Sequence, residues 1–352
     1  MAGIAEVARR AGVSKATASR ALTGRGYVAE DTRARVQSAA AALGYVASTN
    51  AASLVTGRTH TIGLVMPRIS QWFFAEVLEG VQEELLRRGW DLTLYDAKPG
   101  TPTRAAIFNT FLGRKRFDGL IAVGIEPDDH EVERLIAVGK PVVSIGGFDG
   151  GISAVTIDDA DAAWRATEHL IELGHRKIVF VGGIQEGAGT QPLSEVQRVR
   201  GYRSAMGEAG MAELARHVPS TVSMPGGYAA AVDLLGDSRQ RPSAIVGVCD
   251  EVAIGTIIAA RRLGIHVPAD LSVVGIDDHE HADMFSLTTL KQRPREQARI
   301  AVEMLMEHID GDDVQPRRVC EPARLVVRSS TGPLLSRDLA SAGLSPRSRR
   351  TT

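Results

Sequence analysis

The chain has 352 residues, of which 44% are hydrophobic and 24% charged, and its formal net charge is -1. This length allows two or three domains with a sizeable core, and the composition is that of an ordinary globular protein. No apolar run of about 18 residues occurs, so we expect no membrane span. The two cysteines, Cys249 and Cys320, stand far apart, which is typical of a protein of the reducing cytosol.

The charge is unevenly distributed along the chain. Residues 1–58 carry eight basic and three acidic side chains, a net charge of +5, so the remainder of the chain carries -6. A small basic domain joined to a larger acidic one predicts an anionic partner for the small domain only.

The first sixty residues predict a helix-turn-helix. Apolar residues recur at helical spacing over residues 4–11, and Gly12 then allows the left-handed turn that ends a helix. Ser14 can cap a second helix over residues 15–22, and a third helix over residues 31–43 closes a small core. The expected inward residues are Ile4, Val7, Ala8, Ala11, Ala18, Ala21, Leu22, Val36, Ala39, Ala40 and Leu43. The outer face of the second helix is polar and basic, which predicts DNA binding.

From residue 61 onward, apolar β-rich runs alternate with amphipathic helices. Strands are expected at residues 61–66, 91–96, 119–124, 141–146, 177–182, 244–249 and 271–276, with helices such as 74–89 and 160–174 between them. This is the βαβ pattern of a parallel, doubly wound sheet. There are too many units for one sheet, and the strand–loop–helix of residues 61–89 is echoed by residues 177–210. The sequence therefore predicts two lobes.

Several stretches resemble the lactose/galactose-repressor family of bacterial transcription regulators. They include IAEVARRAGVSKATASRAL, SLVTGRTHTIGLV, FFAEVLEGVQEELLRRGWDL, HLIELGHRKIVFVGG, CDEVAIG and LSVVGIDD, in the family's order over residues 2–331. The resemblance implies an α/β body of two doubly wound parallel-sheet lobes, similar to a periplasmic binding protein, behind a small all-α helix-turn-helix domain.

The resemblance also implies the domain boundaries. They are a helix-turn-helix domain over residues 1–46, a hinge helix and linker over 47–60, a two-lobed effector-binding and dimerisation domain over 61–331, and a disordered tail over 332–352. Crossings between the lobes are expected near Asp161, near residues 291–293 and near residues 320–323.

The resemblance places the DNA-reading surface on the second helix and in the hinge. It implies DNA contacts from Ser14, Lys15, Ala16, Thr17, Ser19 and Arg20. Arg20 is the best candidate for a bidentate contact with a guanine edge, the alternative being a phosphate contact only. Leu54 corresponds to the leucine that the family pushes into the minor groove, the alternative being a linker whose Leu54 packs on the effector domain. The family often has Arg where this chain has Ala52, so we expect a weaker grip on the minor groove.

Ligands of such sheets bind outside the carboxyl ends of the strands, and in a two-lobed form those ends face a cleft. The resemblance implies effector contacts from Trp72, Phe73, Phe74, Arg198, Cys249, Asp250 and Asp277. A guanidinium, a carboxylate and an aromatic face favour a carbohydrate-like effector. The alternatives are a salt bridge for Arg198, a turn cap for Asp277, and core packing for Phe73 and Phe74. Many sugar-responsive members carry Asn in place of Cys249, and a thiol is a poor hydrogen-bonding partner, which argues against a standard hexose contact.

Two other signals are set aside. The stretch DDHEHAD, residues 277–283, lacks a third imidazole or a cysteine at a structural-zinc spacing, so we expect a solvated loop and no metal. The glycine-rich residues 182–189 lack a full dinucleotide-binding motif, and no nucleophile or phosphate-loop motif occurs. We therefore expect no cofactor and no catalytic residue.

Together these features predict a cytoplasmic, nucleoid-associated homodimer that regulates transcription, most simply as a repressor. It is expected to bind a palindromic double-stranded DNA operator and to be switched by a small molecule in the inter-lobe cleft. The alternatives are an α/β sugar- or nucleotide-processing enzyme and a sugar-binding transport protein. The absence of catalytic motifs argues against the first, and the helix-turn-helix against the second.

Overall fold

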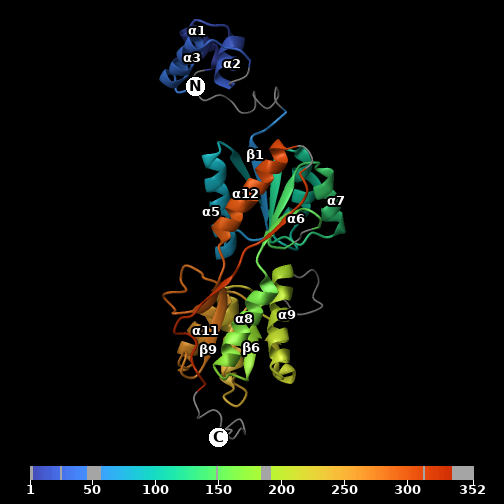
Figure 1. Ribbon diagram of the computed structural model, residues 1–352, viewed down its shortest axis with the longest axis vertical. Helices are drawn as coiled ribbons and strands as arrows, with labels where there is room; N and C mark the ends of the chain where they lie inside the picture. Colours follow the sequence, from blue (N-terminus) through green and yellow to red (C-terminus); the bar gives the residue numbers. More distant parts are fainter. Residues whose placement is uncertain are drawn as a thin grey trace, which may run out of the picture.

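The computed structural model describes residues 3–23, 26–45, 57–147, 150–183, 192–311 and 314–334. They form a small helical domain and two α/β lobes (Figure 1). The predicted fold class is confirmed. Residues 47–56 of the predicted hinge and linker, including Leu54 and Ala52, and residues 335–352 of the predicted tail lie outside the described residues.

The helical domain consists of α1 (Ile4–Ala11), α2 (Lys15–Thr23) and α3 (Glu30–Ala42). Gly12 ends α1 in the left-handed region at φ 68°. The Ser14 Oγ accepts a hydrogen bond from the Thr17 N–H at 3.1 Å, so Ser14 caps α2 as predicted. The core contains one fully buried side chain from each helix: Val7, Ala18 and Val36.

The first lobe is a six-stranded sheet in the order β11-β5-β4-β3-β1-β2, with every neighbouring pair parallel. The strands are β1 (Thr61–Met66), β2 (Asp91–Asp96), β3 (Gly119–Val123), β4 (Val142–Ile145), β5 (Ser153–Thr156) and β11 (Arg318–Cys320). The covering helices are α5 (Trp72–Arg87), α6 (Pro102–Ala106), α7 (Asp129–Ala137) and α12 (Pro294–Asp310). One core lies under α5 and α12, and a second lies under residues 107–112 and α7 (Figure 1).

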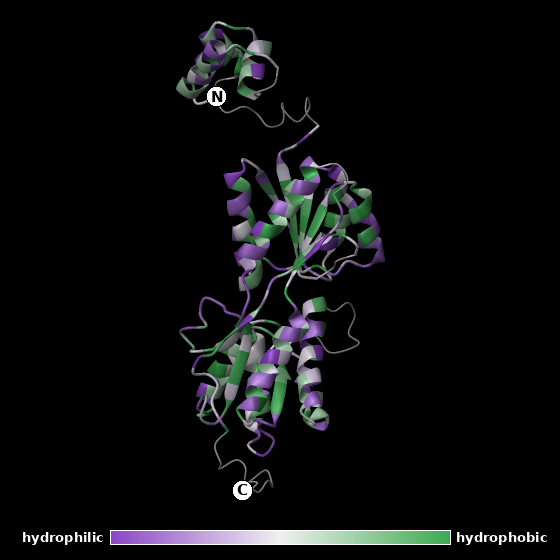
Figure 2. Cartoon of the chain, in the orientation of Figure 1, coloured by the Kyte–Doolittle hydropathy of each residue, from purple (hydrophilic) through white to green (hydrophobic). Residues whose placement is uncertain are grey.

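The second lobe has the order β12-β10-β9-β8-β6-β7. Its strands are β6 (Ile178–Val181), β7 (Arg216–Val218), β8 (Ala244–Gly247), β9 (Ser272–Asp277), β10 (Thr288–Lys291) and β12 (Arg324–Val326). Its helices are α8 (Asp159–Glu172), α9 (Leu193–Glu208), α10 (Met224–Gly236) and α11 (Asp250–Arg262). In both lobes the strands are hydrophobic and the helices carry hydrophilic outer faces (Figure 2).

The strand β12 departs from the expected all-parallel sheet, because it runs antiparallel to β10. Parallel neighbours need a long crossover, usually a helix, within one lobe. The chain instead reaches β12 directly from β11 in the other lobe, so no crossover helix precedes it.

Three connections join the lobes. The chain passes from β5 to α8 across residues 157–158, from β10 to α12 across residues 292–293, and from β11 to β12 across residues 321–323. The order β5-β4-β3-β1-β2 in the first lobe matches β10-β9-β8-β6-β7 in the second. The structure therefore contains the internal repeat that the sequence predicted.

Candidate effector cleft and DNA-binding face

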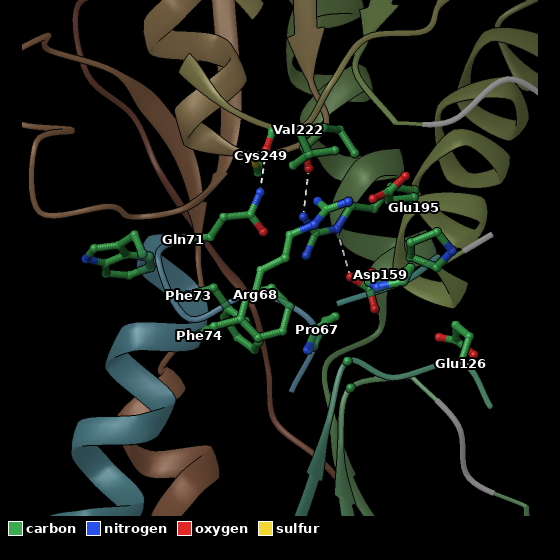
Figure 3. A pocket seen from close by; sticks show the side chains of 18 of the residues that line it. Pro67, Arg68, Gln71, Phe73, Phe74, Glu126, Asp159, Glu195, Val222 and Cys249 are labelled. Carbon is green, nitrogen blue, oxygen red and sulfur yellow. Dashed lines mark hydrogen bonds and ion pairs between the residues drawn. The ribbon is translucent and has the colours of Figure 1, made fainter. Parts of the chain in front are cut away.

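A cavity of about 520 Å³ lies where the carboxyl ends of strands from both lobes meet (Figure 3). In the first lobe its lining includes Arg68, which follows β1, and Gly124, which follows β3. In the second lobe it includes Cys249, which follows β8, and Asp277, which ends β9. Both sheets reverse their strand order beside β1 and β6, and doubly wound folds bind ligands at such reversals.

Trp72, Phe73 and Phe74 begin α5 and form an aromatic wall of this cavity. The rings of Phe73 and Phe74 meet edge to face with centroids 5.5 Å apart. Phe74 also needs the glycine at position 124, since a Cβ there would lie 2.8 Å from its ring. Both phenylalanines pack partly against the first-lobe core. They therefore line the cavity and also contribute to packing.

Arg198 of α9 is buried and points its guanidinium at two carboxylates of the second lobe. Its Nε lies 2.8 Å from Asp159 Oδ1, its Nη1 lies 3.9 Å from Asp277 Oδ1, and Nη1 also donates to the Val248 carbonyl at 2.7 Å. Burial lowers the pKa of Arg198, but the two carboxylates outweigh it and raise the pKa above its ordinary value. The group is thus a fixed positive charge in the cavity wall.

Asp277 lines the same cavity in a strained backbone conformation, with φ at 137°. Its Oδ1 accepts a hydrogen bond from Gln292 Nε2 at 2.5 Å, and Gln297 donates to Gln292 at 3.2 Å. Burial raises the pKa of Asp277 to about 6, against the opposing effect of Arg198 and Gln292. Its oxygens are therefore held by neighbours that also line the cavity.

Asp250, for which the resemblance implies an effector contact, is not part of the lining of the cavity. Its side chain is fully buried under β9, where Oδ1 accepts from the Thr289 hydroxyl at 2.7 Å and Oδ2 from the His279 N–H at 2.8 Å. The glycine at 275 makes room for it, since a Cβ there would lie 2.1 Å from Oδ1. Asp250 begins α11 pointing into the lobe, and so its role is to hold the loop after β9.

Cys249 does line the cavity, at the start of α11. It occupies the N-cap position of this helix. Burial raises the pKa of the thiol well above its ordinary value, so the group stays protonated at neutral pH.

Hydrogen bonds join the two lobes across the cavity. Gln71 Nε2 donates to the Val222 carbonyl, the Trp72 N–H donates to Glu251 at 3.3 Å, and the Leu193 N–H donates to Glu126 at 2.9 Å. Of these residues the sequence indicated only Trp72. The partners could not be predicted, because nothing in a single sequence pairs residues of two separate lobes.

The stretch set aside as a metal site brings three potential ligand residues together. The ligand atoms of His279, Glu280 and His281 lie within 4.8 Å of one another. However, His279 Nδ1 already accepts the His281 N–H at 3.0 Å, and its ring lies 5.1 Å from that of Trp72. These contacts hold the two histidines in the loop that follows β9.

On the helical domain, the predicted DNA face lies along α2. Ser14, Lys15, Ala16 and Arg20 are exposed, while Thr17 and Ser19 are half-buried. Arg20 Nε donates to the Ala16 carbonyl of the same helix at 3.3 Å, and the side chain is exposed. The structure therefore places these side chains on one accessible surface, apart from Leu54, which it does not describe.

A basic helix-turn-helix joined to two lobes with a cavity between them defines a class of protein: a DNA-binding regulator that responds to a small molecule. The sequence profile of the bacterial regulatory proteins of the lacI family matches residues 3–48. That of the periplasmic binding protein-like domain matches residues 167–331.

Full-length relatives agree with these profiles. Catabolite control protein A of Priestia megaterium is 31% identical over 93% of this chain and 98% of its own length. The transcriptional repressor PurR of Proteus mirabilis is 33% identical over 95% and 99%. The lac repressor dimer bound to operator and an anti-inducer has a TM-score of 0.81 and 25% identity, over 94% of this chain and 99% of that one.

The chain therefore belongs to the lacI family. It is a DNA-binding transcription regulator with a small-molecule effector, and it is not an enzyme. Within the described residues, no helix is both long and apolar enough to cross a membrane.

Proposed function

We propose that the protein is a dimeric repressor that acts on the nucleoid in the cytoplasm. Two helix-turn-helix domains bind the half-sites of a palindromic operator, and a small molecule in the cavity between the lobes changes the affinity for that operator. The observation that carries this proposal is the presence, in one chain of the lacI family, of an exposed basic helix and a polar cavity with an aromatic wall.

On the DNA side, we assign base reading to α2. Lys15 and Arg20 supply the positive charge, and the Arg20 guanidinium suits the O6 and N7 edge of guanine. Ser14, Ala16, Thr17 and Ser19 complete the surface that faces the major groove. Leu54 is assigned to the minor groove, where an apolar wedge kinks the duplex.

On the effector side, we assign Arg198 and Asp277 to polar groups of the ligand and the aromatic wall to its apolar face. A carbohydrate-like compound fits this combination, because its ring has one apolar face and a rim of hydroxyls. One solved relative is a CelR–cellobiose complex, with a TM-score of 0.67 and 27% identity, which supports this choice.

The two sites are connected through the first lobe. Gln297, near the start of α12, lines the cavity, and at the end of the same helix the Ile309 carbonyl and the Asp310 carboxylate accept from Arg58 at 3.0 and 2.9 Å. The buried Asp118 accepts the N–H groups of residues 59 and 60 at 3.0 and 2.7 Å. The segment leading to the DNA-binding domain is thus fixed to the lobe, so a change in lobe angle moves it.

Gel retardation with promoter fragments at physiological salt tests the proposal. The full chain is expected to retain specific fragments, and a chain without residues 1–58 is expected to retain none, since it loses the α2 surface and its +5 charge. Circular dichroism of the truncated chain controls for unfolding of the lobes. Undiminished binding by a folded truncated chain would refute the assignment.

A further inference from the structure

The sheet of the first lobe has a second edge besides the one at the cavity. This amino-terminal edge lies at the end of the lobe away from the second lobe, where β1 begins (Figure 1). Because neighbouring strands of this sheet are parallel, the residues that precede them meet there. Asp118, just before β3, accepts the N–H groups of Thr59 and His60 at this edge. The segment from the DNA-binding domain therefore joins the lobe at its amino-terminal edge.

Three consecutive cations, Arg114, Lys115 and Arg116, form a basic turn at this edge. All three residues are exposed, and Lys115 has a left-handed backbone with φ at 50°. The Arg114 guanidinium lies 4.4 Å from the ring centre of Phe111. Among the described residues, no carboxylate lies within ion-pair distance of the basic turn. Its three charges are thus presented to solvent.

The other cations next to this edge are paired with carboxylates. The pairs are Arg58–Asp310 at 2.9 Å, Arg88–Glu84 at 2.6 Å, Lys140–Asp118 at 3.8 Å and Arg317–Glu307 at 2.8 Å. The exposed Asp91, at the start of β2, lies on the same edge and can offset one further charge. At least two positive charges of the basic turn therefore remain in excess.

This excess stands out against the charge of the two lobes. Residues 59–334 carry a net charge of -9, since the whole chain has -1, residues 1–58 have +5 and residues 335–352 have +3. A body with this charge repels a phosphate backbone on average. Unpaired cations at the edge that receives the DNA-binding domain reduce the repulsion where DNA comes nearest.

The length of the chain brings the DNA close to this edge. Arg58 is fixed to the lobe, because it donates to the Asp310 carboxylate and to the Ile309 carbonyl. Leu54, which we assign to the minor groove, precedes it by four residues, and four residues of extended chain span at most about 14 Å. Arginine and lysine side chains are long, and charges act over about 8 Å at physiological ionic strength. Phosphates that border this groove are therefore within range of the basic turn.

We infer that the basic turn contacts phosphates beside the minor groove that Leu54 enters, so that the effector-binding body itself contributes to operator affinity. This inference rests on the proposed function, which places Leu54 in that groove. Phosphate contacts carry no sequence information, so they affect affinity and its salt dependence and leave specificity unchanged. Three cations alone give too little affinity for retention in a gel at physiological salt, so loss of retention without residues 1–58 is still expected.

The test removes the three charges in the full chain with Arg114→Gln, Lys115→Gln and Arg116→Gln. Affinity for a promoter fragment that the wild type retains is measured by fluorescence anisotropy between about 50 and 200 mM salt. The salt slope is expected to become less steep by about two units, because at least one phosphate contact is lost from each subunit of the dimer. The loss of affinity should then be about tenfold larger at the lowest salt than at the highest.

A matched variant removes the same charge from the other end of the body. Arg176→Gln, Lys177→Gln and Arg239→Gln take three exposed cations from the corresponding edge of the second lobe, before β6 and β8, and should leave the salt slope unchanged. A variant with Arg114→Lys and Arg116→Lys keeps the charges and should keep the wild-type slope. Equal changes in the two glutamine variants, or no change in either, would overturn the inference.

Two further readouts separate a phosphate contact from an effect on structure. Single neutral methylphosphonate linkages beside the central minor groove should weaken binding of the wild type more than binding of the variant without the basic turn. Sedimentation velocity should give the same mass for both proteins. Equal losses at every linkage, or dissociation of the variant into monomers, would contradict the contact. If the full chain retains no fragment at all, the proposed function fails; if it retains fragments with an unchanged salt slope, only the contact fails.

Discussion

The helical domain and the cavity between the lobes carry opposite charge. Residues 1–58 have a net charge of +5, with Lys15 and Arg20 exposed on α2, whereas the lining of the cavity, with seven carboxyl and three guanidinium groups, has a formal charge of -4. The two regions also hold their charges differently. The arginine on α2 has no carboxylate within ion-pair distance in the described structure, while Arg198 in the cavity is fixed between Asp159 and Asp277.

This difference shows what each region is suited to recognise. Exposed, unpaired cations release counterions when they meet a phosphate backbone, and so they supply affinity that depends on salt. A buried, paired cation instead holds a fixed geometry and contributes little free charge. The chain therefore separates an anion-binding surface from a cavity that presents hydrogen-bonding groups in fixed positions.

The largest effect is expected where the paired cation of the cavity is removed. Arg198→Met leaves Asp159 and Asp277 without their shared partner, so the free energy of unfolding should fall by about 3–5 kcal/mol. Urea unfolding followed by circular dichroism measures it. As a control, Arg295→Met removes exposed pairs with Glu76 and Glu79 and should cost about 1 kcal/mol or less. Similar losses of stability in the two variants would mean that the ion pairs of Arg198 contribute no more than exposed ion pairs do.

The next effect concerns the hinge. Leu54→Ala should weaken specific operator binding by roughly 2–3 kcal/mol and reduce DNA bending, because the wedge that keeps a base step unstacked is lost. Thermal stabilisation by cavity ligands should be retained. Fluorescence anisotropy and bending by energy transfer provide the two readouts. If neither affinity nor bend changes, residues 47–56 act only as a tether.

The third prediction concerns Arg20, the exposed arginine of α2. Arg20→Ala should cost about 1–3 kcal/mol and relax the preference at one symmetric base pair, because a bidentate contact to guanine is lost. Binding to a set of operators with single substitutions measures this. Lys15→Ala is the comparison, since a phosphate contact weakens all sequences alike. A uniform loss for Arg20→Ala would place its guanidinium on phosphate.

The last effect is a pH dependence inside the second lobe. Burial raises the pKa of Asp250 to about 8 from an ordinary value of 3.8, so between these values the folded state binds more protons than the unfolded state. This contribution to stability is present at low pH and is lost as the pH rises toward 8.

Asp250→Asn mimics the protonated form, so its urea midpoint relative to the wild type should increase with pH across this window. Asp270→Asn serves as control, because a hydrogen bond from the His266 N–H lowers the pKa of Asp270 and places its titration below the window. A midpoint difference that is flat with pH would show that Asp250 stays ionised in the folded protein.

Much of this architecture follows from local sequence patterns. The strands β1 and β2 begin and end where their apolar runs do, and Gly12 and Ser14 mark the turn of the helix-turn-helix. Short strands such as β7 and β12 were missed, because three-residue segments carry too little periodicity. The sequence places Asp250 at a helix start but does not give the direction of its side chain, which is buried inside the second lobe.

The contacts across the cavity could not be predicted either. Glu251 accepts a hydrogen bond from the backbone of Trp72, and Gln71 donates one to the backbone of Val222. Both bonds form between two lobes that have separate cores. Such pairs depend on the relative position of the lobes, which no local pattern encodes.

Allosteric regulation requires reciprocal coupling between the two regions, and this coupling can be measured directly. A thermal-shift screen of sugars, amino sugars, sugar acids and nucleobases identifies the compound that stabilises the full chain most. Operator affinity is then measured with and without that compound, and affinity for the compound with and without operator. We expect the two affinities to change by the same factor, about 5- to 150-fold. A compound that binds in the cavity and leaves operator affinity unchanged would contradict this expectation.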